Sequence, residues 1–115
     1  MQLSSRLVLA LSMGLAGCSR APTVTVANRA TVTLSNVVIS GSGFSNRIES
    51  IAAGVDHTLT IHPSGDSGLR LVFDAGGQHI DSAEQGYFEA GSGYRVKATV
   101  DTNLSVSVTS DLSPY

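Results

Sequence analysis

From Cys18 onward, apolar residues stand at every second position in several separate runs of the chain. Successive side chains of an extended strand point to opposite faces, so a two-residue period places one apolar row on one face of a sheet. β-branched residues, which pack well on a pleated surface, make up 25 of the 98 residues that begin at Cys18. The clearest runs are Val24 and Val26; Leu69, Leu71 and Phe73; Tyr94, Val96, Ala98 and Val100; and Leu104, Val106 and Val108. This pattern predicts an all-β domain.

Short segments rich in Gly, Pro, Asn, Asp and Ser separate these runs at intervals of about 8–12 residues, a spacing typical of β-sandwiches and barrels. We therefore expect a small immunoglobulin-like or related antiparallel β-sandwich of seven to eight strands. The expected strands are 22–27, 31–40, 47–52, 55–62, 68–74, 78–88, 93–100 and 104–110.

In "TVTLSNVVIS" the apolar phase slips between Leu34 and Val37, because an odd separation sends one of the two to the wrong face of a regular strand. A β-bulge near Asn36 would restore the phase. The slip is also what a strand shows where it leaves one sheet for the other at a sandwich corner. Both interpretations predict an irregularity at this point.

The first seventeen residues have the layout of a secretory signal peptide. They contain one cation, Arg6, no acid, and an apolar block from Leu7 to Leu11 that continues through Met13 and Leu15. The block is shorter than the roughly 20 apolar residues that cross a bilayer. An amphipathic first helix packed on the domain is the alternative, but consecutive apolar residues would cover every face of such a helix.

The segment "LAGC", Leu15 to Cys18, contains the single cysteine of the chain. It resembles the lipobox of bacterial lipoproteins. The resemblance implies cleavage between Gly17 and Cys18, a diacylglyceryl group on the Cys18 sulfur and, in many species, a fatty acyl group such as palmitate on the new amine. Ser19, where aspartate would favour the inner membrane, then implies the outer membrane of a Gram-negative host. The alternative is a buried structural thiol.

The predicted organisation is a signal peptide at 1–17, a lipidated tether at 18–21 and a β-sandwich domain at 22–115. Beyond Gly17 the chain has six cations and nine acids and no cationic run, which speaks against binding the phosphate backbone of nucleic acids. With one cysteine the domain has no internal disulfide, so its own apolar core has to hold it together.

Residues that could carry catalysis do not form a recognisable set. "GDSG" at 65–68 matches the nucleophile motif of trypsin-like serine proteases, but Leu69 replaces the next glycine of that family and its histidine motif is missing upstream. We interpret this segment as a hairpin connection built on turn-forming residues. A carboxylate pair for sugar hydrolysis has no more specific support; its candidates are Asp81, Glu84 and Glu89. We expect no enzymatic activity and no small-molecule substrate.

Three histidines, His57, His62 and His79, raise the possibility of a metal site, which needs several converging ligands. His57 and His62 stand an odd five residues apart, so a regular strand would point them to opposite faces. His57 follows the apolar phase and is expected inside the sandwich or at a strand end, which leaves His79 as the best candidate ligand. We predict no metal and no cofactor beyond the lipid on Cys18.

Phe44 stands alone among small polar residues in the predicted turn "GSGFSN", at 41–46. An aromatic side chain on such a loop can fill a pocket of a partner, and Arg47 beside it can supply directed hydrogen bonds. Phe44 could instead fold back and close one end of the sandwich. Tyr87 and Phe88 are adjacent, so one is expected in the core, and Tyr87 is the third candidate partner contact.

Arg70, Arg95 and Lys97 are expected on one solvated outer face. Together these observations predict a membrane-anchored envelope lipoprotein on the outer membrane, facing the periplasm, that acts as a non-catalytic protein-interaction or accessory module. Its partners would be the membrane, through the lipid, and another envelope protein. The alternative function is a carbohydrate- or metal-binding periplasmic module.

Overall fold

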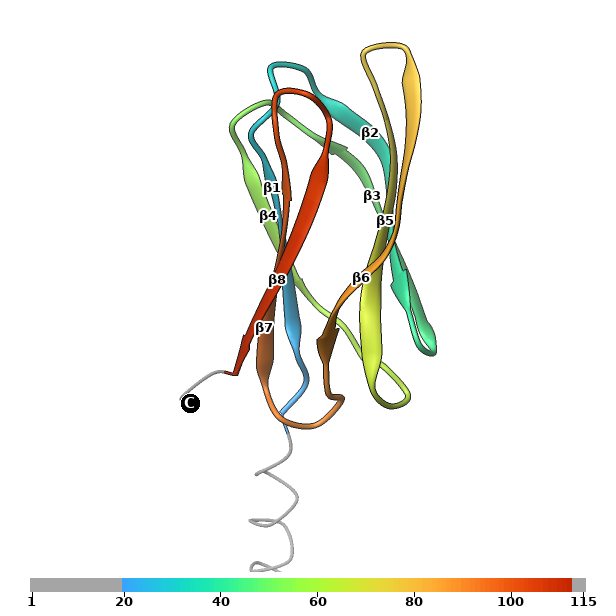
Figure 1. The fold of residues 1–115 in the computed structure, drawn as a ribbon, viewed down its shortest axis with the longest axis vertical. Helices are drawn as coiled ribbons and strands as arrows, with labels where there is room; N and C mark the ends of the chain where they lie inside the picture. Colours follow the sequence, from blue (N-terminus) through green and yellow to red (C-terminus); the bar gives the residue numbers. More distant parts are fainter. Residues whose placement is uncertain (1–19, 113–115) are drawn as a thin grey trace, which may run out of the picture.

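Eight strands and no helix make up residues 20–112, the part of the chain that this computed structural model describes. They form two four-stranded sheets packed face to face, with orders β4-β1-β7-β8 and β3-β2-β5-β6 (Figure 1). The all-β sandwich expected from the alternation is confirmed. The strands are β1 Thr23–Asn28, β2 Leu34–Gly41, β3 Phe44–Ile51, β4 Asp56–Thr60, β5 Ser67–Ala75, β6 Gln78–Phe88, β7 Tyr94–Val100 and β8 Val106–Leu112.

One strand pair departs from the expected antiparallel arrangement. β1 and β7 run parallel, in register from Thr23 opposite Arg95 to Asn28 opposite Val100. A parallel pair needs a long connection between its strands, and here β2 to β6 supply it. Apolar alternation reports which face a residue occupies but not the direction of the neighbouring strand, so this pairing was not visible in the sequence.

The core lies between the inner faces of the two sheets. Alternate residues of β5 and β7 are buried, among them Phe73 and Val96. In β8, Val106 and Val108 are only half-buried, because β8 is an edge strand of its sheet. The largest fully buried side chains are Phe73, Phe88, Leu34, Ile39, Ile51, Ile61, Leu69, Leu71, Val24, Val26, Val37 and Val96.

The phase slip in β2 is a β-bulge. The register of β2 against β5 shifts between Ser35 and Val38, and Asn36 has a φ of 50°. Asn is one of the few residues other than Gly that adopts this left-handed conformation readily. Leu34 and Val37 are both fully buried as a result, and β2 stays in one sheet throughout. The bulge interpretation is therefore confirmed, and a strand that switches sheets is excluded.

Two predicted turns differ from the structure. Gly41 pairs with Phe44, so the connection of β2 to β3 is reduced to Ser42 and Gly43, with Gly43 at a φ of 75°, and β3 begins at Phe44 rather than at residue 47. The segment at 65–68 is not a hairpin, because β4 and β5 lie in different sheets and the chain crosses between them there.

The first described residue is already held by the domain. The Arg20 amide donates to the Gly91 carbonyl at 3.1 Å, and the Gly93 amide donates to the Arg20 carbonyl at 2.9 Å. We call this end of the sandwich the Arg20 end. The connections β2–β3, β4–β5 and β6–β7 lie there, and the other four connections lie at the opposite end (Figure 1). Arg20, assigned above to the tether, thus packs as part of the domain.

Candidate functional site

Phe44 belongs to the packing of the domain. It is partly buried, lies against the core cluster, and its ring centroid is 6.3 Å from that of the fully buried Phe88. The two rings are tilted by 52°, an arrangement that aromatic pairs favour. Because Phe44 starts β3 beside the β2–β3 turn, the pair closes the core at the Arg20 end. The alternative in which Phe44 folds back onto the sandwich is therefore the one observed.

Arg47 heads a row of polar contacts across the outer face of the sheet β3-β2-β5-β6. Its guanidinium donates to the Asn36 side-chain oxygen, and the Asn36 amide donates to Asp74 at 3.0 Å. The other Asp74 carboxylate oxygen lies 2.7 Å from His79 Nδ1. We call these four residues, one from each strand, the outer row. The hydrogen bonds from His79 and Asn36 lower the pKa of Asp74.

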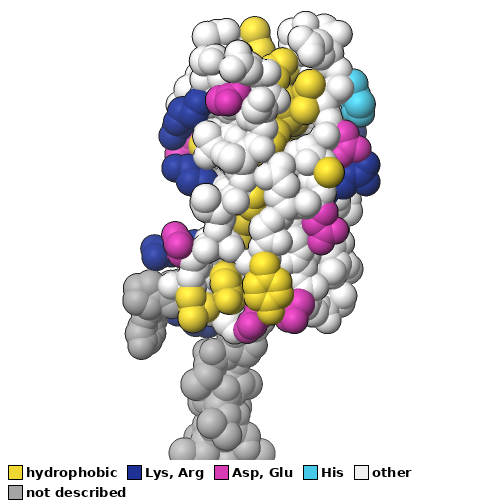
Figure 2. Space-filling view, viewed as in Figure 1, with side chains coloured by type: hydrophobic (Ala, Val, Ile, Leu, Met, Phe, Trp, Pro, Cys, Tyr) yellow, Lys and Arg dark blue, Asp and Glu magenta, His cyan; other side chains and the backbone are white. Residues whose placement is uncertain are grey.

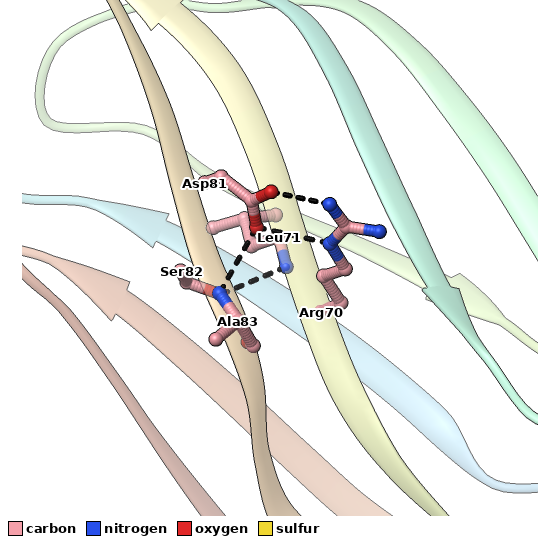
Figure 3. A network of polar contacts seen from close by, with 5 residues as sticks. All are labelled: Arg70, Leu71, Asp81, Ser82 and Ala83. Atoms are coloured by element: carbon pink, nitrogen blue, oxygen red, sulfur yellow. Dashed lines mark hydrogen bonds and ion pairs between the residues drawn. The ribbon is translucent and has the colours of Figure 1, made fainter.

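A second ion pair lies on the same outer face. Arg70 on β5 forms two hydrogen bonds with Asp81 on β6, one of 2.9 Å from Nε (Figure 3). The Ala83 amide also donates to Asp81, at 3.0 Å. These contacts hold the pKa of Asp81 well below its usual range, with the Arg70 bond as the main cause. Both side chains are about half exposed, so solvent and salt weaken the pair.

The three histidines do not come together. His79 belongs to the outer row, His62 follows the end of β4, and His57 lies opposite Val26 on the edge strand β4. His57 follows the expected apolar phase, because it shares a face with Val26, and it lies at the start of β4, as the strand-end alternative has it. It is exposed rather than interior, because an edge strand leaves that face open. Within residues 20–112, no three His, Cys, Asp or Glu side chains are grouped closely enough to hold a metal ion.

The carboxylates that might pair for hydrolysis have separate partners. Asp81 is bound to Arg70. Glu84 accepts from the Gly68 amide at 2.9 Å, and Glu89 accepts from Tyr87 and Ser92.

The serine of "GDSG", Ser67, is buried. Its hydroxyl oxygen lies 2.6 Å from the Gly68 carbonyl and 2.9 Å from the Ser42 amide. In the described structure these groups serve the packing of strands and turns.

Tyr87 is the exposed member of its pair, as predicted, and Phe88 is the buried one. The Tyr87 hydroxyl donates to Glu89 at 3.2 Å, and its carbonyl accepts from Ser110 Oγ at 2.6 Å, which ties β6 to β8. Partial burial and the carboxylates of Asp66 and Glu89 raise the pKa of Tyr87 to about 12. The Tyr87 hydroxyl therefore stays protonated at neutral pH and remains a hydrogen-bond donor.

The cations expected on one outer face lie on two. Arg70 faces out from β5, whereas Arg95 and Lys97 are on β7 in the other sheet. The shared-face prediction is wrong, because alternation does not reveal which sheet a strand joins.

On that other sheet an open groove of about 360 Å³ crosses the outer face. Thr58, Thr25, Lys97 and Thr109 stand in one cross-strand row there, and the hydroxyls of Thr25 and Thr58 are 2.7 Å apart. The alternating threonines of "TVT" at 23–25 and "TLT" at 58–60 are the sequence pattern that could have indicated this surface. The groove is lined by Thr25, Asp56, Thr58, Arg95, Val96, Lys97, Thr109 and Asp111.

Gly17 and Cys18, the predicted cleavage and lipidation residues, lie outside the described residues. Residues 20–112 contain no helix long and apolar enough to cross a membrane.

The chain matches no known family and no curated protein sequence. Among solved structures, an NMR structure of a protein from Eubacterium rectale is similar, with a TM-score of 0.50 and 13% sequence identity. The match covers 83% of this chain and 92% of that one. At this identity the likeness shows the fold alone, which agrees with a small all-β domain.

Proposed function

We propose that the protein is a lipid-anchored lipoprotein of the outer membrane that acts as a non-catalytic module and binds another envelope protein. The "LAGC" segment with its preceding apolar block supports the anchor. The Arg20 contacts indicate how such an anchor would hold the domain. A residue two positions after Cys18 is hydrogen-bonded to the domain, so a lipid on Cys18 would hold the whole sandwich without a flexible linker.

The proposed mechanism is positional. Confining the domain to the membrane raises its effective concentration toward partners in the same membrane, so a modest interface suffices. Of the three candidate contacts, Phe44 packs against the core, so the side chain of Arg47 is more accessible to a partner than that of Phe44. Arg47 is exposed and part of the outer row, where its guanidinium donates to Asn36 and keeps further N–H donors for a polar partner surface.

The anchor is tested by growing cells with an alkyne-bearing fatty acid and measuring the mass of the purified protein. We expect a chain that begins at Cys18 and carries fatty acyl groups, and an unlabelled product from C18S. A chain of full length with a free thiol would overturn the anchor.

The partner is tested by mild crosslinking in intact cells with the wild type, C18S and R47Q. The wild type should capture one envelope protein that C18S captures poorly and R47Q captures less. The control is R70Q, which removes a cation from the same sheet face without touching the outer row. Equal capture by all four chains would contradict a positional mechanism.

The groove on the sheet β4-β1-β7-β8 favours carbohydrate as the second candidate ligand. Its threonine hydroxyls, with Arg95 and Lys97 beside them, are donors and acceptors suited to a polar glycan. Binding on a glycan array should be lost in T25V/T58V. That result, together with equilibrium dialysis against metals, would separate this function from a protein-interaction module. A pure interaction module retains neither glycan nor metal.

A further inference from the structure

We propose that the Arg20 end of the sandwich lies against the bilayer and that Tyr87 and Leu112 contact the phospholipid headgroup region there. This inference rests on the proposed lipid anchor and adds an orientation and a lipid-contacting surface to it. The lipid-contacting surface is defined as Arg20, Tyr87 and Leu112.

The chain between the proposed anchor and the domain is short. Each extended residue spans at most about 3.3–3.6 Å, so the two residues from Cys18 to Arg20 reach about 7 Å. Arg20 cannot swing away from the sandwich without breaking its two backbone hydrogen bonds to the β6–β7 connection. A lipid on Cys18 therefore brings the β6–β7 connection to the membrane surface.

The Arg20 end exposes large apolar side chains. Tyr87 is 50% exposed and Leu112 is 58% exposed, the two highest values among the large apolar residues of the described chain. Both lie at the Arg20 end: Leu112 pairs with Tyr94, the first residue of β7, and Ser110 binds the Tyr87 carbonyl. Apolar side chains are visible at this end of the molecule, with acidic groups beside them (Figure 2).

The chemistry of these side chains suits the boundary between water and lipid. Tyrosine has an apolar ring and a polar tip, and it is enriched at the interface between water and lipid. The Tyr87 hydroxyl donates its one proton to Glu89, so its ring supplies apolar contact, and Arg20, which is exposed, can pair with a lipid phosphate. Glu89 beside Tyr87 is acidic and repels anionic headgroups. The surface therefore fits a mainly zwitterionic phospholipid layer.

The chain contains no tryptophan, so a single introduced tryptophan reports on one position. Y87W places it at the Arg20 end, and V55W places it at the opposite end on a residue of similar exposure, 46% against 50%. Each lipidated variant is purified from membranes and reconstituted in phosphatidylethanolamine vesicles with a minor fraction of phosphatidylglycerol and with brominated acyl chains. C18S forms of both variants, mixed with the same vesicles, are the controls.

A side chain in the interface lies within about 5–10 Å of the headgroup and acyl boundary. We expect Y87W to lose about half or more of its emission and to shift to the blue, and V55W to match its C18S control. L112W should behave like Y87W, and it tests the same surface if Y87W does not fold. Quenching of V55W as strong as that of Y87W would overturn the orientation.

Vesicle flotation, measured on the same samples, distinguishes a failure of the proposed orientation from a failure of the proposed anchor. A protein that floats while neither Y87W nor L112W is quenched is anchored but faces the lipid with another surface, which overturns this inference and leaves the anchor standing. A protein that carries no lipid and does not float overturns the proposed function itself.

Discussion

Removing the rings of Phe44 and Phe88, singly and together, measures whether Phe44 belongs to the core or is free to bind a partner. Phe88 is fully buried and Phe44 is partly buried, with 6.3 Å between their centroids. Three chains are compared with the parent: F44A, F88A and the double variant. All of them carry C18S, which removes the proposed lipid anchor from the comparison.

The expected losses of stability follow from how deeply each phenylalanine ring is buried. Deleting a fully buried phenylalanine costs about 3–5 kcal/mol, so F88A should remove a large share of the roughly 5–15 kcal/mol that a small domain has. Phe44 loses less surface, and we expect about 1.5–3 kcal/mol. The paired rings add about 0.5–1.5 kcal/mol beyond their buried area. The double variant should therefore be more stable than the sum of the two losses predicts, by about 1 kcal/mol.

The free energy of unfolding is measured by urea titration, with the slope checked for constancy across the four chains. S45A, next to Phe44 on the exposed side of β3, is the control and should change stability by less than about 0.5 kcal/mol. A loss below about 0.5 kcal/mol in F44A, with additive single effects, would refute a packing role. If F44A with Cys18 intact lost the crosslinked partner, while its C18S form remained as stable as the C18S parent, the partner-contact interpretation would be correct instead.

Three further changes test the site and the loops. Asn36→Ala should lower the free energy of unfolding in urea by about 1–2 kcal/mol, because alanine is strained at a φ of 50°. Asn36→Gly should recover the share of that loss that comes from backbone strain, and equal losses in the two variants would argue against strain. Asp81→Asn should destabilise the domain at pH 7. Because the folded pKa of Asp81 is lowered, its contribution is complete above the unfolded pKa of about 4 and declines as the pH falls from there through the folded pKa. The urea midpoints of the variant and the parent should therefore differ most at pH 7 and by less at pH 3. Asn28→Ala should cost about 3 kcal/mol in thermal or urea unfolding, since it leaves buried backbone groups unpaired, and Asn103→Ala in an exposed turn should be nearly neutral.

Local sequence patterns predicted the strands well where the two faces of a strand differ. β5 and β7 sit inside their sheets, and their alternation is reproduced residue by residue in their burial. The bulge was predictable for the same reason, since burial of both Leu34 and Val37 requires one extra residue between them. In each case one strand and its own side chains contain the information.

The errors concern what a strand lies next to. The parallel pairing of β1 with β7, the exposure of His57 on an edge strand, and the separation of Arg70 from Arg95 all depend on strand order. Strand order is set by contacts between residues far apart in the chain, which a local pattern does not contain. The turn at 41–46 failed differently, because its Gly, Ser and Asn residues are turn formers, yet Ser45 and Asn46 pair with Ser40 and Ile39 inside the hairpin.

The end opposite Arg20 is stiff, and its height above the proposed membrane surface follows from strand length. The side chain of Asn28 donates to the carbonyls of Val32 at 2.9 Å and Ile51 at 3.0 Å, and its backbone binds the segment that ends at Val55. Val32 and Val55 are thus exposed on loops that are already ordered, so binding through them costs little conformational entropy. The eight residue steps from Arg20 to Asn28 rise about 3.3 Å each, so these loops would lie about 26 Å from the Arg20 end and from the bilayer beneath it. A partner in the same membrane that uses this end must itself extend about that far, whereas a partner that lies close to the lipid must use the outer row or the groove on the flanks of the sandwich.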